Sequence, residues 1–299
     1  MYYILCNPLS ANKQGAVLSQ SLISKLSGED LKFIDIRDVK DYAEFFNTID
    51  MKKDHVILSG GDGTLNRFIN ANIENELPEN LFYFASGSGN DFKHDVSPDS
   101  DELIPLHKYI RDLPIVTVNG KTSRFINGIG YGIDGYCCEV GDKKKEKSDK
   151  PVNYTGIAIK GLLFFFKPTN ARVTVDGVTT EYKKVWIAPT MKGKYYGGGM
   201  MVAPEQDRFD ADGMLTVALM HGKGKIKTLM VFPSIFQGEH VKHTEMVTIL
   251  RGHEITVEFD RPTALQIDGE TVLNVTSYTV NSGRKGSADK PTASVSVKG

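Results

Sequence analysis

The hydrophobic pattern of this chain changes at Pro114, and the change constrains the fold more than any other feature. Up to that residue, short apolar runs alternate with stretches of helical periodicity. The pattern predicts strands over 2–6, 31–36, 55–58 and 81–85, and helices over 16–26, 42–49 and 64–73. Such alternation favours a parallel sheet covered by helices on both faces, with ligands at the carboxyl ends of the strands.

After Pro114 the apolar residues follow a period of two, which is typical of antiparallel strands. Strands are predicted over 115–118, 172–175, 185–189, 214–219, 246–250, 254–259 and 263–267, with Asx-Gly turn pairs between them at 119–120, 176–177, 212–213 and 268–269. Segments 153–166 and 225–240 are compatible with helices. We therefore expect a three-layer α/β domain over 1–114 and a mainly antiparallel β-sandwich over 115–280, whose last strand can pack with either domain. Residues 281–299, rich in Ser, Gly and Lys, are predicted to be a disordered tail.

Charge and cysteine content narrow the class of protein. The chain has 299 residues and a formal net charge of -1, so no global basic field is available to hold nucleic acid. Three cysteines without metal-binding spacing favour a reducing compartment. No apolar run approaches the roughly 20 residues that cross a bilayer, and the N-terminal run is too short for a signal peptide. We expect a cytoplasmic protein that can contact the inner face of the membrane, with a homodimer left open.

The run from Ser59 to Asn66, SGGDGTLN, follows a predicted strand and opens a predicted helix. Small residues let backbone amides approach a phosphate chain, and the N-terminus of a helix favours an anion. The glycine spacing differs from both the dinucleotide fingerprint and the P-loop. A plain tight turn is the alternative. The predicted phosphate-binding residues are Gly60, Gly61, Asp62, Gly63, Thr64, Leu65 and Asn66.

Two further polar loops belong to the same sheet edge, because each follows a predicted parallel strand. Loop 7–13 carries Asn7, Ser10 and Lys13, and loop 85–92 carries Ser88, Asn90 and Asp91. A remote segment, 266–270, ends in Glu270, whose carboxylate could accept a proton from an alcohol if the fold brought it to these loops. From the spacing alone, a hairpin turn with an exposed acid is favoured.

Together, in this order and over roughly residues 2 to 280, these motifs resemble the diacylglycerol kinase catalytic-domain superfamily, in particular the soluble bacterial lipid kinases. The resemblance implies ATP bound in a cleft between an α/β domain and a β-sandwich. It implies that Asp62 lies near the phosphates and the metal, and that Glu270 activates a lipid hydroxyl for in-line attack on the γ-phosphate. Arg37 falls near a position that contacts nucleotide in relatives, and Ser88 stands where the family usually has Thr.

The same resemblance implies a Mg²⁺ site that uses the side chain of Asp212 and the carbonyls of Phe209 and Met214, an oxygen-only set that suits a hard cation. The strand predicted over 115–118 lacks the Asp that relatives often carry there, so we expect the usual carboxylate network around the metal to be reduced or rerouted.

Several alternatives remain open at this stage. NAD kinases share the Gly-Gly-Asp-Gly-Thr run, and sphingoid bases or ceramide are other acceptors within the superfamily. The altered loop over 85–88 motivates a catalytically silent nucleotide or lipid sensor. Finally, the lysine-rich stretch 141–150 is predicted to be a loop. Together with the apolar segment 154–166 it could contact a membrane surface. The alternative is that 141–150 is an ordinary solvated loop and 154–166 a buried helix.

Overall fold

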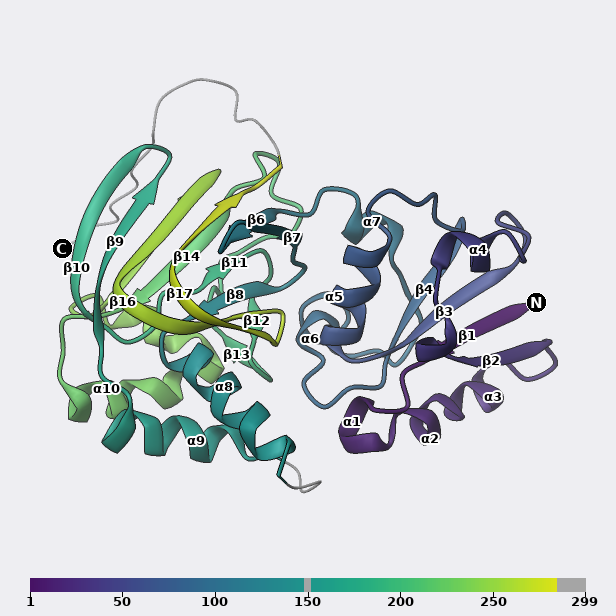
Figure 1. Cartoon of the computed structure of the whole chain (residues 1–299), viewed down its shortest axis with the longest axis horizontal. Helices are drawn as coiled ribbons and strands as arrows, with labels where there is room; N and C mark the ends of the chain where they lie inside the picture. The colour runs from purple at the N-terminus through teal and green to yellow at the C-terminus, as the bar shows by residue number, and fades with distance from the viewer. Residues whose placement is uncertain (148–151, 284–299) are drawn as a thin grey trace.

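The computed structural model describes residues 1–147 and 152–283. Two domains lie side by side (Figure 1), the first built on a mainly parallel sheet and the second on antiparallel strands. The predicted fold class, an α/β domain followed by an antiparallel β-sandwich, is confirmed.

The first sheet has the strand order β2-β1-β3-β4-β5. Strands β1 to β4 are parallel to one another, and only β5 pairs antiparallel. Leu22 packs on one face of the sheet against Ile4 and Ile57, while the helices of the other face bury Phe46 and Phe68. The elements are β1 (Tyr2–Cys6), α1 (Ser10–Lys13), α2 (Gly15–Ser19), α3 (Ser21–Lys25), β2 (Leu31–Asp35), η1 (Ile36–Asp38), α4 (Tyr42–Phe46), β3 (His55–Gly60), α5 (Asp62–Ala71), β4 (Asn80–Ala85), α6 (Asp91–Val96), β5 (Ile104–Pro105) and α7 (His107–Ile110).

The second domain is organised around a long hairpin of β16 and β17. The sheet runs β15-β14-β11-β8-β16-β17-β6-β7, and β9 joins it through β16 and carries β10. The elements are β6 (Ile115–Val118), β7 (Lys121–Arg124), β8 (Gly128–Tyr131), α8 (Ile133–Lys145), α9 (Tyr154–Lys160), η2 (Gly161–Phe165), β9 (Thr169–Val175), β10 (Val178–Val185), β11 (Thr190–Met191), β12 (Tyr195–Tyr196), β13 (Met200–Met201), β14 (Leu215–Met220), α10 (Lys225–Val231), η3 (Phe232–Gln237), η4 (Glu239–Lys242), β15 (Val247–Gly252), β16 (Glu254–Ile267) and β17 (Glu270–Asn281).

Strand β16 closes the sandwich because it changes partners along its length. Its first half pairs with β9, its second half pairs with β8, and the register shifts between Glu258 and Thr263. The two segments predicted over 254–259 and 263–267 are therefore one irregular strand. The last strand, β17, pairs with β16 and β6, both in the second domain.

Some local predictions were wrong. The helix predicted over 16–26 is divided into α2 and α3, and of the strand predicted over 185–189 only Val185 belongs to a strand, while Ile187 forms isolated bridges. The lysine-rich stretch 141–150 was predicted to be a loop, but residues 141–145 complete α8, and only 146–147 of its described part form a turn. Helix α8 was missed because glycines interrupt its pattern. Gly135 is needed there, since a Cβ would lie 1.9 Å from the Ala264 carbonyl oxygen of β16.

The predicted tail began too early. Asn281 is the last residue of β17, where it pairs with Glu254 and Ile115. Residues 284–299 of the predicted tail, and 148–150 of the predicted lysine-rich loop, lie outside the described residues. Among the helices of 1–147 and 152–283, none combines the length and the apolar character that crossing a bilayer requires.

Candidate functional site

Three polar loops meet at the carboxyl edge of the parallel sheet, as the sequence predicts. In chain order, the first is 7–13, the second is the glycine run with its flanks, 59–66, and the third is 85–92. The strand ends are adjacent, with Cys6 beside Ser59 and Gly60 beside Ala85. The second and third loops touch backbone to backbone, since a Cβ on Gly87 would lie 2.3 Å from the Cα of Gly61. Only glycine allows this approach, which brings the two loops together beside the first turn of α5.

The first loop is tied to the others through Asn7 and Ser10. The Asn7 amide donates to the Thr64 hydroxyl at 2.7 Å, and the Ser10 hydroxyl donates to the Asn7 carbonyl oxygen at 2.8 Å. The carbonyl oxygen of Ser86 lies 3.3 Å from the same hydroxyl. Lys13 is exposed at the end of α1. The predicted residues of this loop therefore lie together at the site.

Helix α5 begins within the glycine run (60–63), with Gly61 as its N-cap and no side-chain cap. The first amides of a helix have no carbonyl partner within it, so they are available to an anion. Leu65 and Asn66 point away from this end. Leu65 is fully buried in the core, and Asn66 donates to the Arg124 carbonyl and to Asp268. The side chains of these two predicted residues therefore do not face the phosphate-binding end of the helix, and the Leu65 amide donates to the Gly61 carbonyl at 3.1 Å.

Asp62 joins the two glycine loops. Its carboxylate accepts bonds from the backbone amides of Asp91 and Phe92, both at 2.9 Å, and from the Asn127 side-chain amide at 3.0 Å. It therefore holds the first amides of α6 and a residue of the second domain. This geometry makes Asp62 a positioning residue, and its predicted contact with phosphate or metal stays a prediction.

Asp91 joins the third loop to the second domain. Its buried carboxylate accepts bonds from the amides of Gly198 and Gly199, at 2.9 and 2.6 Å. Burial, followed by the neighbouring Asp62 charge, raises the pKa of Asp91 above the usual range of a carboxyl. Asn90 is left-handed, with φ 54, and its side chain closes a turn on Gly87. Ser88 is exposed at the tip of this loop.

The turn between β16 and β17 reaches the first domain through Asp268. This buried carboxylate accepts four bonds: from the amides of Ile126, Asn127 and Gly128 at 2.6, 2.8 and 3.0 Å, and from the Asn66 side chain at 2.8 Å. Burial raises the pKa of Asp268, although all four bonds oppose the shift. From the sequence, Asp268 was predicted only to be a turn residue. An Asp-Gly pair beside the candidate base was the signal available, but it could not reveal partners more than a hundred residues away.

Glu270 lies two residues beyond Asp268, over the first turn of α5. Its Oε1 accepts bonds from the Arg67 guanidinium, at 2.6 Å from Nη2 and 3.1 Å from Nε. A Cβ on Gly63 would lie 2.9 Å from the same oxygen, which shows how closely the side chain approaches the glycine run. The Glu270 side chain is 44% exposed. The structure thus brings Glu270 to the glycine run. This proximity is the condition that a catalytic role of Glu270 requires.

Arg208 is a second residue that sequence reasoning missed. Its nearly buried side chain pairs with Asp95, donates to the Ile126 carbonyl, and donates to the Asn127 side chain at 2.6 Å. Its guanidinium also lies 5.1 Å from the Phe92 ring centre. Because Asn127 binds Asp62, Arg208 connects the predicted metal segment to the glycine loops.

The predicted Mg²⁺ ligands lie directly after Arg208. Asp212 is exposed, and among the described contacts its carboxylate has no hydrogen bond or ion pair. The Met214 carbonyl accepts a bond from Gln206 at 3.1 Å, and the ring of Phe209 packs against Tyr109. Within the described part of the chain, no cluster of three His, Cys, Asp or Glu residues could hold a metal. The oxygen donors still fit Mg²⁺, which commonly takes one carboxylate and completes its shell with water and phosphate oxygens.

Arg37 lies near the same sheet edge, because it follows β2, which ends beside β1. Its guanidinium binds Asp35, at 2.5 Å from Nη2 and about 3 Å from Nε, and this pairing lowers the pKa of the Asp35 carboxyl. The Nε and Nη2 groups of Arg37 therefore bind Asp35, and its predicted contact with the nucleotide stays a prediction.

Known proteins share both halves of this architecture. Residues 1–114 match the family described as diacylglycerol kinase catalytic domain, and residues 127–281 match the family described as YegS C-terminal NAD kinase beta sandwich-like domain. A protein of Mycobacterium tuberculosis (strain ATCC 25618 / H37Rv) named diacylglycerol kinase is 23% identical over 255 residues, covering 82% of this chain and 81% of the relative. The diacylglycerol kinase of Bacillus subtilis (strain 168) is 24% identical over 225 residues, covering 73% and 71%. A solved diacylglycerol kinase structure from Bacillus anthracis str. Sterne superposes with a TM-score of 0.61 at 19% identity, covering 94% of each chain, which shows a shared fold.

Proposed function

Because the chain belongs to the diacylglycerol kinase catalytic domain family, we propose that it transfers the γ-phosphate of ATP to a hydroxyl of a diacylglycerol-like or related lipid. Membership of this family makes the protein a phosphotransferase. The observation that carries the finer proposal is the position of Glu270. A carboxylate from the second domain lies against the glycine run of the first, next to amides suited to a phosphate chain.

The nucleotide is proposed to lie along the edge formed by the glycine run, the loop at Gly87, and the loop of Asn7 and Ser10. Backbone amides at the start of α5 would bind its phosphates, and Lys13 and Ser88 are exposed nearby to contact it. Asp62, Asp91 and Asp268 have a structural role and do not contact the nucleotide in this proposal. Each accepts amide bonds that join loops, so they fix the shape of the site before ATP arrives.

Glu270 is proposed to be the proton acceptor. Arg67 holds Oε1, and among the described contacts Oε2 has no partner, so one oxygen is fixed while the other can face the acceptor. As the lipid hydroxyl oxygen attacks the γ-phosphorus, its proton passes to Oε2 and the bond to the β–γ bridging oxygen breaks, releasing ADP. Positioning and charge neutralisation supply most of the rate enhancement in this chemistry.

Mg²⁺, if bound by Asp212 and the carbonyls of Phe209 and Met214, would neutralise charge on the phosphates. Arg208 would hold this segment against the glycine loops through Asn127. A lipid acceptor resides in a bilayer, so transient contact with a membrane surface is part of the proposal.

The test is transfer of labelled γ-phosphate from ATP with Mg²⁺ to diacylglycerol, phosphatidylglycerol, ceramide and sphingosine in mixed micelles, and to NAD. Glu270→Ala is assayed beside wild type. Glu239→Ala is the matched control, because Glu239 is also an exposed, ion-paired glutamate, at 2.7 Å from Lys242. We expect one lipid to be labelled by wild type and the control but not by Glu270→Ala.

Other outcomes would overturn parts of this proposal. Label on NAD alone would replace the lipid acceptor with a nucleotide. ATP binding without labelling of any acceptor would favour a silent sensor. Full activity of Glu270→Ala would exclude Glu270 as the proton acceptor.

A further inference from the structure

Large apolar side chains project into solvent from one side of the second domain. Phe164 and Phe165 of η2 are 70% and 66% exposed, and Ile226 and Met230 of α10 are 77% and 73% exposed. Ile159 of α9 is also exposed. Side chains of this size are seldom left in water as a group unless they meet a partner. We call the surface formed by α9, η2 and α10 the helical face.

The helical face is one surface, although its two segments are far apart in sequence. Helices α9 and α10 lie along the lower edge of the second domain in Figure 1. Lys225 at the start of α10 donates to the Leu163 carbonyl of η2 at 3.0 Å. The π-helical geometry of η2 is uncommon, and it directs two adjacent phenylalanines outward, with ring centres 6.2 Å apart.

The charge of the helical face has a single sign along both segments. Residues 154–167 and 223–231 contain Lys160, Lys167, Lys223, Lys225 and Lys227, and no Asp or Glu. Among the ion pairs of the described residues, only one involves these lysines. It joins Lys227 to Glu245, which lies outside the two segments, at 3.1 Å. Apolar side chains flanked by lysines are what an anionic bilayer surface attracts. A second copy of the chain would bring the same positive charge and would be repelled.

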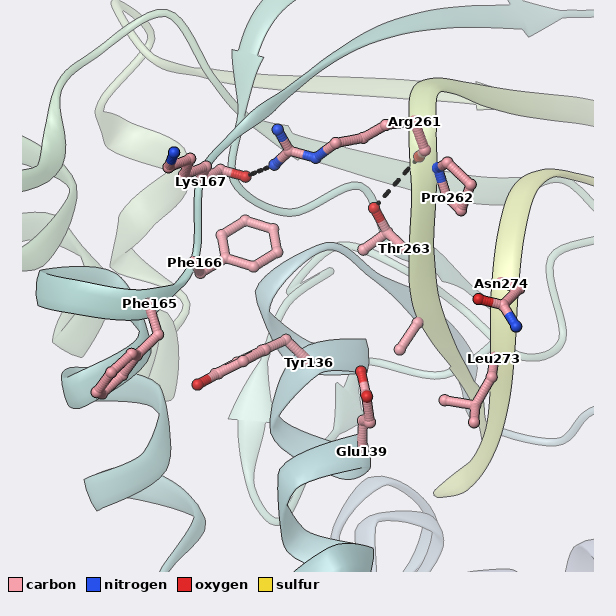
Figure 2. A pocket seen from close by; sticks show the side chains of 11 residues that line it. Tyr136, Glu139, Phe165, Phe166, Lys167, Arg261, Pro262, Thr263, Leu273 and Asn274 are labelled. Atoms are coloured by element: carbon pink, nitrogen blue, oxygen red, sulfur yellow. Dashed lines mark hydrogen bonds between the residues drawn. The ribbon is translucent and has the colours of Figure 1, made fainter.

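A hollow of about 460 Å³ begins at the edge of this face. Phe165 and Lys167 form one side of it, and Tyr136 and Glu139 of α8 form another, as Figure 2 shows. The opposite wall includes Leu273, on the same strand as Glu270 and three residues beyond it. Three strand residues span about 10 Å, so the wall at Leu273 lies about that far along β17 from the proposed base.

We propose that the helical face docks the protein on an anionic lipid bilayer, with Phe164, Phe165, Ile226 and Met230 in the interface and the lysines at the level of the lipid phosphates. The hollow beside Phe165 then opens onto the membrane surface. The proposal deepens the proposed function, because it names the surface through which a lipid kinase would meet its substrate.

The test is flotation of the full chain with vesicles of phosphatidylcholine alone or with 30% phosphatidylglycerol (about one anionic lipid in three), without ATP. Wild type should float with the anionic vesicles, and added salt should weaken the binding. The double variants Phe164→Ser/Phe165→Ser and Ile226→Ser/Met230→Ser should each bind at least about tenfold more weakly, since burial of such side chains contributes most of the attraction. Lys160→Glu should reduce binding about fivefold or more.

Val178→Ser is the matched control. Val178 is also an exposed apolar residue, at 56%, but it lies at the far end of the β9–β10 hairpin and should leave binding unchanged. The two α10 positions and the two η2 positions are substituted in separate variants. The side chains of both pairs are exposed, so the fold should tolerate the substitutions, and circular dichroism would verify this.

Wild-type levels of binding by both double variants would overturn the proposal, as would equal binding to neutral and anionic vesicles. A dimer in sedimentation that Phe164→Ser/Phe165→Ser dissociates would assign the face to a second copy and would also overturn it. The kinase proposal is tested separately with a short-chain, water-soluble diacylglycerol. The Ile226→Ser/Met230→Ser variant, whose residues do not line the hollow, should phosphorylate it as wild type does, while losing activity toward acceptors in vesicles. Vesicle binding by wild type without any phosphorylation would leave docking intact and overturn the kinase.

Discussion

The substitution Asp268→Asn should weaken the joint between the two domains. Both oxygens of Asp268 accept bonds, Oδ1 from the amides of Asn127 and Gly128, and Oδ2 from the Ile126 amide and the Asn66 side chain. All four partners are donors. An asparagine amide in either orientation therefore directs an NH₂ group at two of them, and those two buried donors lose their acceptor.

The magnitude follows from these contacts. Two bonds to a charged acceptor are lost, at about 1.5–3 kcal/mol each, which gives about 3–6 kcal/mol. Removing a charge from a buried position offsets part of this loss, because burial raises the pKa of Asp268 and so disfavours its ionised form. We therefore expect the free energy of unfolding to fall by about 3 kcal/mol, near the lower end of that range.

The assay is urea unfolding followed by circular dichroism at neutral pH, with Asp176→Asn as the matched control. Asp176 occupies the same position in an Asp-Gly hairpin turn and also accepts backbone amides, from His253 and Glu254, but it is exposed. The control should lose no more than about 1 kcal/mol. Asp268→Asn should also lower kcat while ATP still binds, since Glu270 follows two residues later. Equal stability of the two variants, within about 0.5 kcal/mol, would refute the argument that these buried donors depend on the carboxylate.

Three further predictions concern separate parts of the molecule. Burial raises the pKa of Asp134 to about 6, from an ordinary value near 4, although the Tyr196 hydroxyl donates to its side chain. The folded state therefore binds a proton that the unfolded state releases, so stability should fall by about 3 kcal/mol as the pH rises from below 4 to above 6. Asp134→Asn should remove this fall in urea unfolding at pH 4, 6 and 8, and an unchanged pH profile would contradict the assignment. Gly87→Ala should weaken ATP binding in calorimetry and destabilise the fold by about 1–3 kcal/mol, because the new methyl would collide with Gly61; Gly224→Ala, which meets no atom within 4 Å, is its control and should change neither. Asp212→Asn should raise the Mg²⁺ concentration needed for half-maximal phosphoryl transfer without changing the melting temperature, since its carboxylate is exposed; an unchanged Mg²⁺ dependence would remove Asp212 from the metal site.

Local signals made the first domain predictable. Strand β1 was predicted with its observed bounds, and the glycine run was placed correctly at a junction of strand and helix, although β3 extends through Gly60 and α5 already begins at Asp62. These features depend on apolar periodicity and on backbone freedom, which nearby residues determine. The predicted gathering of three loops at one edge followed from the geometry of parallel sheets alone.

The parts that the sequence did not reveal depend on distant pairs. Asn66 and Asp268 are 202 positions apart, and Asp91 binds amides of Gly198 and Gly199 more than a hundred residues later. No local pattern distinguishes these carboxylates from ordinary turn acids. Arg208 illustrates the same limit, because an arginine in a polar segment gave no sign of its near-complete burial. Nucleotide-facing roles were assigned to Asn66 and Asp91 from motif position, whereas their side chains hold the two domains together.

The position of the β16–β17 hairpin has a consequence for biosynthesis. These two strands leave the ribosome after all the other described strands, yet they fill the middle of the sheet, between β8 and β6, which are made more than a hundred residues earlier. Until the hairpin arrives, β8 and β6 have unpaired edges that invite intermolecular pairing, and the sheet cannot close around its core. The first domain has no such dependence and can fold while the rest is still being synthesised. A nascent chain would therefore acquire its glycine loops early and its candidate base only at the end, which delays phosphoryl transfer until both domains have formed.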